Sequence, residues 1–366
     1  MSRLFATYHV RSDARAIEGR ARAIAVEQSV EMPLSAIEDQ HILDDIVGSV
    51  ENIGEVSPGL FAVRIALSRA TVGDDAGQLI NMLFGNTSLQ DDVVLHDAEF
   101  PDDVAAGFRG PNIGLGGLRK RAAADGRALT CSALKPQGLS PARLTELAAR
   151  FARGGIDYIK DDHGLADQAY SPFAARCAAI AKTLRALAHE TGKHTRYVPS
   201  LTGDLDALRT QIAAAKDNGI DTVMVQPMIM GFSNFMTLKR ENPGIAFFAH
   251  PTLAGAARIA PALLFGKIFR MLGADALVFP NHGGRFGYTP DTCRALAQTA
   301  LASWHGCKPA VPVPAGGMTV GRVGEMLDFY GADVMLLIGG ALLEARERLT
   351  DETAAFVAEV KRYRYE

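Results

Sequence analysis

Residues 154–163 read GGIDYIKDDH, and their apolar, β-branched middle is typical of a buried strand. The last four of these residues, Lys160 to His163, leave the end of that strand. Two acids, a lysine and a histidine are costly to bury unpaired. A divalent cation would balance the charge, because carboxylate oxygens are ligands that Mg²⁺ prefers. A cluster of salt bridges across the same end of the sheet is the alternative interpretation.

Similar apolar runs recur along the chain after residue 127, and Ala/Leu/Arg-rich stretches with helical periodicity separate them. The runs are 129–134, 156–160, 196–201, 222–226, 245–249, 276–279, 309–314 and 333–338. Each unit has the size of a strand with a crossover helix, and eight such parallel units close into a barrel of about 250 residues. The sequence therefore predicts an α/β protein with a (β/α)8 TIM barrel over residues 116–366. An open doubly wound sheet is the alternative, but no GxGxxG turn opens the series.

The first 115 residues lack this repeat and predict a separate domain. Strand-like patterns cover residues 3–10 and 45–68, the latter around the turn Ser57-Pro58-Gly59, and helical spacing covers 13–26 and 74–84. This mixture predicts an α+β domain of the ferredoxin-like type, with one face of its sheet covered by helices.

Composition excludes several classes of protein. A formal net charge of −3 leaves no basic surface for nucleic acid or anionic lipid. The four cysteines form neither a CxxC pair nor a disulfide framework. No apolar run is long enough for a transmembrane helix, and the N-terminus lacks an apolar signal core. We therefore expect a cytoplasmic enzyme whose partner is neither nucleic acid nor membrane.

Polar and glycine residues collect at the carboxyl ends of six of the eight predicted strands, which is where barrel enzymes carry their chemistry. They include Lys135, Lys160 to His163, His250, Arg285, Gly316-Gly317 and Gly339-Gly340. Glycine pairs allow backbone N–H groups to approach a phosphate closely, although a tight turn alone also explains each pair.

These motifs resemble the large chain of ribulose-bisphosphate carboxylase (Rubisco), and more closely its non-carboxylating relatives, the form IV RuBisCO-like proteins. The resemblance rests on residues 154–162, on KPQGLS at 135–140, on FRGP at 108–111 and on the two glycine pairs. The motifs follow the family's order from about Glu27 to the C-terminus. The resemblance implies a homodimer in which two chains share each active site, with a small phosphorylated sugar as substrate.

The resemblance also implies a metal site. Lys160 matches the lysine that is carbamylated in the family, and Asp162 matches a Mg²⁺ ligand. His163 stands where the family has a glutamate ligand, and imidazole is a poor ligand for Mg²⁺. A site with fewer protein ligands, a site that uses Asp161, a different ion and no metal at all therefore stay open.

Further roles follow from the same resemblance. Lys135 matches the lysine of proton transfer, whereas the second lysine of that motif is replaced by Gln137. His250 is a candidate acid or base beside the two lysines. Asn86 and Glu27 match N-terminal residues that reach the barrel of the neighbouring subunit, and Gly316, Gly317, Gly339 and Gly340 match the turns that hold one phosphate.

Four residues depart from the carboxylase pattern and narrow the range of reactions that we expect. Arg285 aligns with the mobile-loop lysine that handles CO₂, and an arginine is bulkier and always protonated. Pro251, Val278 and Ala315 replace the three donors of the second phosphate site. An unpaired buried dianion costs several kcal/mol, so we expect a monophosphate with a less polar far end and no carboxylation.

Three RuBisCO-like reactions fit this expectation, and all pass through an enediolate. Isomerisation of 5-methylthioribulose-1-phosphate is the best single prediction. The enolase acting on 2,3-diketo-5-methylthiopentyl-1-phosphate uses a lysine where this chain has Asn86, which argues against it. Decarboxylation of a phosphorylated 3-oxo sugar acid, of the 3-oxo-isoapionate 4-phosphate type, is the main alternative. A metabolite sensor without turnover is the alternative from a different class.

Overall fold

The computed structural model describes residues 2–365, which pack as two compact units. One unit contains the chain up to Arg109 together with residues 253–264, and the other contains residues 110–252 and the chain from Phe265 onward. The segment 253–264 pairs with β4 (Val93–Glu99) through a bridge between Leu95 and Ile259. No sequence pattern indicated that this segment would leave the barrel region.

The N-terminal unit is an antiparallel sheet in the strand order β2-β3-β1-β4. Its elements are β1 (Arg3–Arg11), α1 (Ile17–Glu27), β2 (Ser49–Ser57), β3 (Leu60–Ser68), α2 (Ala76–Phe84), β4 and α3 (Asp102–Phe108). Four shorter helical turns lie between them: η1 (Leu34–Ala36), η2 (Ile42–Ile46), η3 (Arg69–Thr71) and η4 (Asn86–Leu89). Burial alternates strictly along β1, so one face of the sheet contributes to a core. This order of strands and helices is the predicted ferredoxin-like α+β arrangement.

The sequence pattern missed two elements of this unit, α3 and β4, and β4 illustrates the reason. Its sequence VVLHDAE mixes apolar and charged residues, and its pairing with β1 shifts register between Thr7 and Tyr8. A bulge of this kind breaks the simple alternation by which a half-buried strand is recognised.

The second unit contains eight parallel strands in the order β7-β6-β5-β12-β11-β10-β9-β8. They are β5 (Leu129–Leu134), β6 (Tyr158–Asp161), β7 (Arg196–Val198), β8 (Thr222–Val225), β9 (Ala246–Ala249), β10 (Ala276–Pro280), β11 (Val311–Ala315) and β12 (Met335–Leu337). The first and last strands of this order, β7 and β8, are joined by a parallel bridge between Ser200, just after β7, and Met224 of β8. The predicted eight-stranded barrel is therefore confirmed, and each predicted run overlaps one strand.

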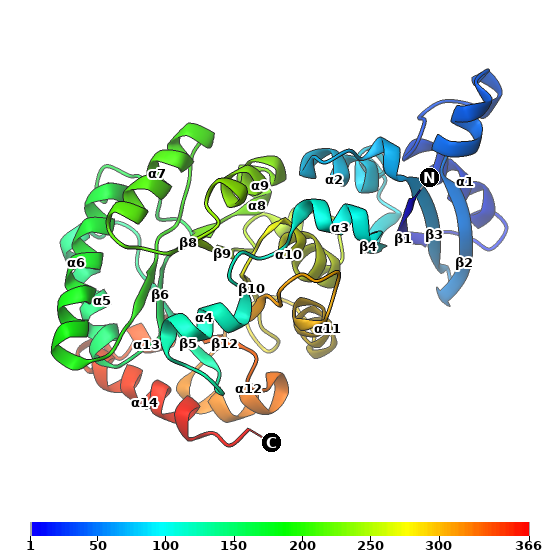
Figure 1. Ribbon diagram of the computed structural model, residues 1–366. Helices are drawn as coiled ribbons and strands as arrows, with labels where there is room; N and C mark the ends of the chain where they lie inside the picture. Colours follow the sequence, from blue (N-terminus) through cyan, green and yellow to red (C-terminus); the bar gives the residue numbers. More distant parts are fainter. Residues whose placement is uncertain (1, 366) are drawn as a thin grey trace. The chain divides into compact units, whose positions relative to one another are not determined.

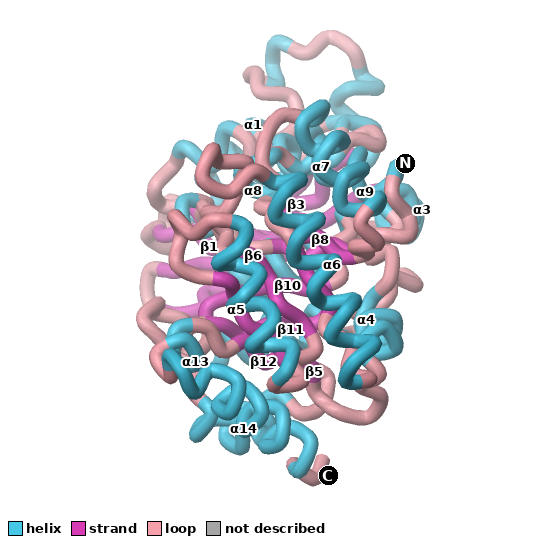
Figure 2. Tube along the Cα trace, turned by 90° about the vertical axis from the view of Figure 1, so that its left-hand side faces the viewer, coloured by secondary structure: helices cyan, strands magenta, loops and turns pink. Residues whose placement is uncertain are grey.

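Helices lie outside the strands, with α5, α6 and α7 on one side and α12 and α14 on another (Figure 1). The helices of this unit are α4 (Gly114–Ala122), α5 (Pro141–Arg153), α6 (Phe173–Thr191), α7 (Leu205–Asp217), α8 (Pro227–Met230), α9 (Phe232–Glu241), α10 (Arg270–Leu272), α11 (Pro290–Leu301), α12 (Val323–Tyr330), α13 (Gly340–Leu343) and α14 (Leu349–Arg362). Figure 2 shows α5 and α6 side by side in front of the strands. Among the helices of residues 2–365, none is long and apolar enough to cross a membrane.

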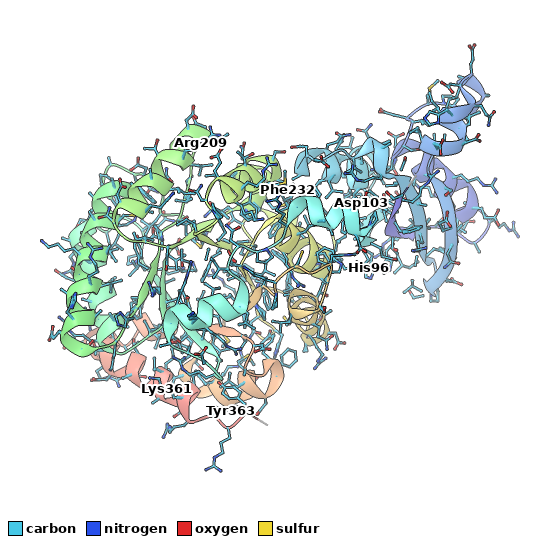
Figure 3. All side chains as sticks on the ribbon, in the orientation of Figure 1. His96, Asp103, Arg209, Phe232, Lys361 and Tyr363 are labelled. Carbon is cyan, nitrogen blue, oxygen red and sulfur yellow. The ribbon has the colours of Figure 1, made fainter. Side chains whose placement is uncertain are left out.

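Side chains fill the ring of strands, whereas labelled residues such as Arg209 and Lys361 lie on the outer helices (Figure 3). The barrel core combines inward residues of all eight strands, among them Tyr158 and Phe248, with Leu115 and Leu118 of α4. The Tyr158 hydroxyl donates to the Leu118 carbonyl at 2.8 Å. Helix α4 therefore packs on the core, and the polar side chains sit beyond the core at the carboxyl ends of the strands.

Candidate active site

Strand β6 places Lys160 and Asp162 inside the barrel and turns Asp161 away from it. Side chains alternate along a strand, and Tyr158, two residues before Lys160, belongs to the barrel core. Lys160 and Asp162 continue this inward row at the carboxyl end, where they are 4% and 5% exposed. Asp161 instead forms a buried ion pair with Arg176 of α6, with Nε 3.2 Å from Oδ2.

Lys135 and Asp162 form an ion pair at the barrel mouth, with Nζ 2.7 Å from Oδ2. The other carboxylate oxygen accepts from the Gly164 amide at 3.0 Å and lies 3.5 Å from Nε2 of Gln137. Burial raises the pKa of Asp162, but the hydrogen bonds from Lys135 and Gly164 outweigh it and lower the pKa to about 2. Asp162 is therefore ionised at neutral pH and gives Lys135 a fixed counter-ion.

Lys160 lies deeper than Lys135, and its Nζ donates to the backbone carbonyl of Asp161 at 2.9 Å. Burial lowers the pKa of Lys160, and the charge of Lys135 adds to this effect while Asp162 opposes it. A lowered pKa increases the share of neutral amine. Only the neutral amine accepts a proton or reacts with CO₂ to form a carbamate, so Lys160 is suited to either role.

The rings of His163 and His250 stack over the same site, with centroids 4.6 Å apart and planes 8° apart. Nδ1 of His250 lies 2.6 Å from Oγ1 of Thr252. Burial lowers the pKa of His250 to about 2, and the charge of Lys160 contributes to this shift. Burial lowers the pKa of His163 as well. Both rings are therefore neutral near pH 7, and with so low a pKa His250 is suited to hydrogen bonding and not to accepting a proton.

The two glycine pairs follow β11 and β12, and they differ in whether packing of the fold requires a glycine. Gly317 has a φ of +66°, and a Cβ there would meet Cα of Gly284 at 2.7 Å, so the fold itself requires this glycine. Gly339 and Gly340 have no such constraint, because a Cβ at either position would enter open space. The turn after β12 therefore keeps an open backbone surface that packing does not demand.

This turn borders a hollow of about 500 Å³ that also includes Lys135. Its other lining residues come from the loop after β5, from α5 and from α13: Pro136, Leu139, Arg143, Glu146, Leu147, Arg150 and Leu343. The structure thus joins the lysine of one strand end to the glycine turn of another in a single depression.

Arg285 is exposed on the loop after β10, where its guanidinium lies 4.9 Å from the ring centroid of Phe286. Its charge contributes to the lowered pKa of His163, after burial and the nearer lysines. The loop approaches the turn after β11 closely, since a Cβ on Gly284 would meet the Gly316 carbonyl oxygen at 2.9 Å.

Strands β9, β10 and β11 are apolar at or next to the three positions that the sequence singled out. Val278 is 2% exposed and belongs to the barrel core, where Ala315 packs against it. Pro251 follows His250 and carries no N–H donor. A second phosphate would find no hydrogen-bond donor from the side chains of these residues.

Asn86 and Glu27 belong to the N-terminal unit, whereas Lys135, Lys160, Asp162, His163 and His250 belong to the second unit. Asn86 donates to Oε1 of Glu27 at 3.0 Å and to Oε1 of Glu31 at 2.9 Å. Sequence analysis missed Glu31, which lies beyond the end of α1 and has a φ of +54°, so helical spacing gave no signal for it.

Without modification, the side chains at the barrel mouth provide too few ligands for a magnesium ion. Within residues 2–365, no three His, Cys, Asp or Glu side chains come together as metal ligands. Asp161 does not fill the gap, because its oxygens accept from Arg176, from the Tyr197 hydroxyl and from the Ser200 amide. Carbamylation of Lys160 would add oxygen donors beside Asp162, and with that group the residues fit a hard cation.

Eight parallel strands that carry lysines, a carboxylate and open glycine turns at their carboxyl ends define a (β/α)8 barrel enzyme. Residues 114–344 match the family model described as ribulose bisphosphate carboxylase large chain, catalytic domain. The chain belongs to this family, and its similarity to RuBisCO-like proteins places it among them.

Individual relatives are similar over nearly the whole chain. The 5-methylthioribulose-1-phosphate isomerase of Rhodospirillum rubrum is 63% identical over 98% of this chain and 96% of the relative. The 2,3-diketo-5-methylthiopentyl-1-phosphate enolase of Geobacillus kaustophilus is 30% identical over 93% of this chain and 88% of the relative. The crystal structure of a Rubisco-like protein from Rhodopseudomonas palustris has a TM-score of 0.94 at 50% identity, over 100% of this chain and 99% of the other.

Proposed function

We propose that this protein isomerises a sugar monophosphate through an enediolate, with 5-methylthioribulose-1-phosphate as the substrate. The observation that carries the proposal is the asymmetry of the barrel mouth. The turn at Gly339-Gly340 after β12 is open without a packing reason, whereas Pro251, Val278 and Ala315, on or next to β9 to β11, offer no side-chain donors. A ligand with one phosphate and an apolar thioether end matches this asymmetry, and the Rhodospirillum rubrum relative bears the corresponding name.

Gly316, Gly317, Gly339 and Gly340 bind the phosphate through backbone N–H groups in this proposal, and Arg285 closes over the bound ligand. Backbone donors suit an anion because their hydrogen bonds to it are charge-assisted. Together these groups fix the position of the carbon chain between Lys135 and Lys160.

Proton transfer is assigned to the lysines. An amine takes the proton from the carbon beside the carbonyl, the C–H electron pair becomes the C=C bond of the enediolate, and the carbonyl oxygen gains a proton. Return of a proton to the neighbouring carbon, while the hydroxyl on the first carbon loses its proton and becomes the new carbonyl, gives the isomer. Lys135 is 41% exposed and paired with Asp162, so it can exchange protons with solvent between the two steps. The neutral ring of His250 adds a hydrogen bond to the oxygen.

In the carbamylated form of the protein, Lys160, Asp162 and His163 would hold a Mg²⁺ ion, and proton transfer would then fall to Lys135, because a carbamate is no longer an amine. When bound, the ion supplies positive charge that stabilises an oxyanion. Asp162 suits this role because it is already ionised at neutral pH. In the unmodified chain, Lys135 is the counter-ion of the same carboxylate.

The proposed enzyme is a cytoplasmic homodimer in which Asn86 and Glu27 of one chain complete the site of the other. The enolase reaction is the second candidate, because relatives that bear that name cover most of this chain. Carboxylation is not proposed, since Arg285 replaces the lysine that handles CO₂ in the carboxylases and the second phosphate site lacks its donors.

The test is incubation of the purified protein with 5-methylthioribulose-1-phosphate in D₂O. NMR should show deuterium entering at carbon and an isomeric monophosphate accumulating. The diketo phosphate should be a much poorer substrate, and a phosphorylated 3-oxo acid should release no CO₂. Absence of both exchange and product would exclude the isomerase, and CO₂ release would instead identify a decarboxylase.

A further inference from the structure

Arg176 of α6 is a fully buried cation in the wall between the barrel and its helices, with 0% exposure. Its Nη1 donates to the Ser171 carbonyl at 2.6 Å, and its Nη2 donates to the Ala166 carbonyl at 2.9 Å. Its Nε donates to Oδ2 of Asp161 at 3.2 Å and lies 3.3 Å from the Tyr197 hydroxyl. One guanidinium thus connects a barrel strand with two points of the following loop.

At the strand, hydrogen bonds from other residues also hold the side chain of Asp161 in place. The Tyr197 hydroxyl donates to Oδ1 of Asp161 at 2.7 Å, and the Ser200 amide donates to Oδ2 at 3.1 Å. The backbone carbonyl of the same aspartate accepts from Nζ of Lys160 at 2.9 Å. The side chain of Asp161 therefore holds the peptide group against which the Lys160 amine rests.

The loop end of the network carries the other reactive residues. Residues 162–172 leave β6 with Asp162 and His163 first, and both carbonyls bonded by Arg176 lie within this loop. The loop is further braced by Gln168, whose Nε2 donates to the Gly164 carbonyl at 2.7 Å. A change in the guanidinium contacts would release the segment that presents Asp162 to Lys135.

We propose that Arg176 is a positioning residue of the candidate active site, acting through Asp161 on Lys160 and through the loop on Asp162. Burial of this charge is compensated by hydrogen bonds that only a planar guanidinium makes at once. A lysine at this position would keep the charge but would reach at most part of these acceptors. The kinetic part of this inference rests on the proposed function, whereas the placement of Lys160 does not.

The chain offers a matched control in Arg270 of α10, which is also 0% exposed. Its guanidinium donates to the backbone carbonyls of Lys308, Thr299 and Cys307 at 3.0, 3.0 and 2.9 Å. None of these partners belongs to the candidate site. Arg176→Lys and Arg270→Lys therefore impose the same chemical change in two buried places.

The first measurement is acetylation of Lys160 by acetic anhydride, followed by mass spectrometry, in variants with native circular dichroism. Arg176→Lys should accelerate labelling by about tenfold, because about 1.4 kcal/mol of lost local order exposes the amine tenfold more often. Tyr197→Phe, which removes one hydroxyl, should give a smaller acceleration and serves if Arg176→Lys does not fold. Arg270→Lys should label like the wild type.

The second measurement is the isomerisation itself. Arg176→Lys should lower kcat by at least about tenfold while KM stays within about threefold, because the phosphate turn is untouched. Arg270→Lys should leave both constants unchanged. Equal labelling of Lys160 in all folded variants would overturn the inference, as would equal effects of the two arginine changes. A wild type without turnover would refute only the proposed function, since the labelling result still decides the role of Arg176.

Discussion

Lys135 and Asp162 show how one residue pair sets the chemistry of the barrel mouth. Their ion pair holds the pKa of Asp162 at about 2 and leaves Lys135 partly open to solvent. The strand-end pattern predicted both residues. It did not predict their pairing: β5 and β6 are neighbouring strands, but strand-end polarity alone does not tell which side chains of adjacent strand ends meet.

Lys135→Ala should reduce turnover by about three orders of magnitude or more, because it removes the proposed proton carrier. The measurement is kcat/KM for 5-methylthioribulose-1-phosphate, with the exposed Lys182→Ala as the control that retains full activity. A variant that binds substrate and still performs its biological role would instead favour a sensor.

Gly340→Ala should raise KM for the phosphorylated substrate by about tenfold, since a methyl group there obstructs the proposed backbone contact. The fold should tolerate the change, because a Cβ at this position meets nothing within 4 Å. Gly324→Ala in α12 adds an equally unobstructed methyl away from the site and should leave KM unchanged. Equal KM values for both variants would remove Gly340 from the phosphate site.

His250 should make the protein less stable in acid. Burial lowers its pKa to about 2, with Lys160, His163 and Lys135 adding to the shift and Asp162 opposing it. The folded state therefore binds fewer protons than the unfolded chain below about pH 6.5, and stability falls there by at most about 1.4 kcal/mol per pH unit from this residue.

His250→Gln should flatten this dependence. Urea unfolding at pH 7.5, 6.0 and 5.0 measures it, and the difference between variant and wild type should change in the variant's favour as the pH falls. Parallel curves for the two proteins would contradict the assignment of a neutral, buried ring.

At the scale of single elements, strand β6 shows which features of the site the sequence predicted and which it did not. Its apolar run identified the strand, and its charged end identified the site. The two adjacent aspartates looked equivalent in the sequence, but the alternation of a strand gives them opposite roles. Asp162 faces the barrel interior. Asp161 instead binds Arg176 of α6 and Tyr197 of β7, which lie 15 and 36 residues further along the chain.

Asp275, which precedes β10, should be a strong determinant of stability. Its Oδ1 accepts from the amides of Ile113 and Gly114 at 2.6 and 2.7 Å, and its Oδ2 accepts from the Phe247 amide at 2.7 Å. An asparagine would present N–H₂ to one of these donors, so Asp275→Asn should destabilise the protein by about 1–3 kcal/mol.

The measurement is the free energy of unfolding from chemical denaturation, with the exposed Asp206→Asn as a control expected to change it by less than about 0.5 kcal/mol. An unchanged unfolding free energy for Asp275→Asn would show that these hydrogen bonds are replaced by water.

At the scale of the whole molecule, the prediction concerns the shared site. Lys135→Ala and Asn86→Ala should each be inactive alone, because each removes one contribution to every site of the proposed homodimer. Mixing the two variants after partial dissociation should restore up to about a quarter of the activity, since a mixed dimer has one site with both residues intact.

Sedimentation equilibrium would establish that dimers form and exchange. Failure of the mixed sample to regain activity, despite proven exchange, would place Asn86 outside the neighbouring chain's site.

The sequence predicted the barrel, the ferredoxin-like arrangement and the residues at the strand ends, because periodicity and strand-end polarity are local properties. It did not predict α3, β4, the contacts of Arg176 or the association of 253–264 with the N-terminal unit. These depend on partners far along the chain, such as Leu95 with Ile259, and no local pattern encodes them.

The association of residues 253–264 with the N-terminal unit has a consequence for folding during translation. Leu95 donates to the Arg258 carbonyl and accepts from the Ala260 amide, both at 2.9 Å. During translation the N-terminal sheet therefore emerges from the ribosome more than a hundred residues before the segment that completes its edge. This unit must wait, partly assembled, until most of the barrel has been synthesised, and that interval is when a chaperone would find β4 uncovered.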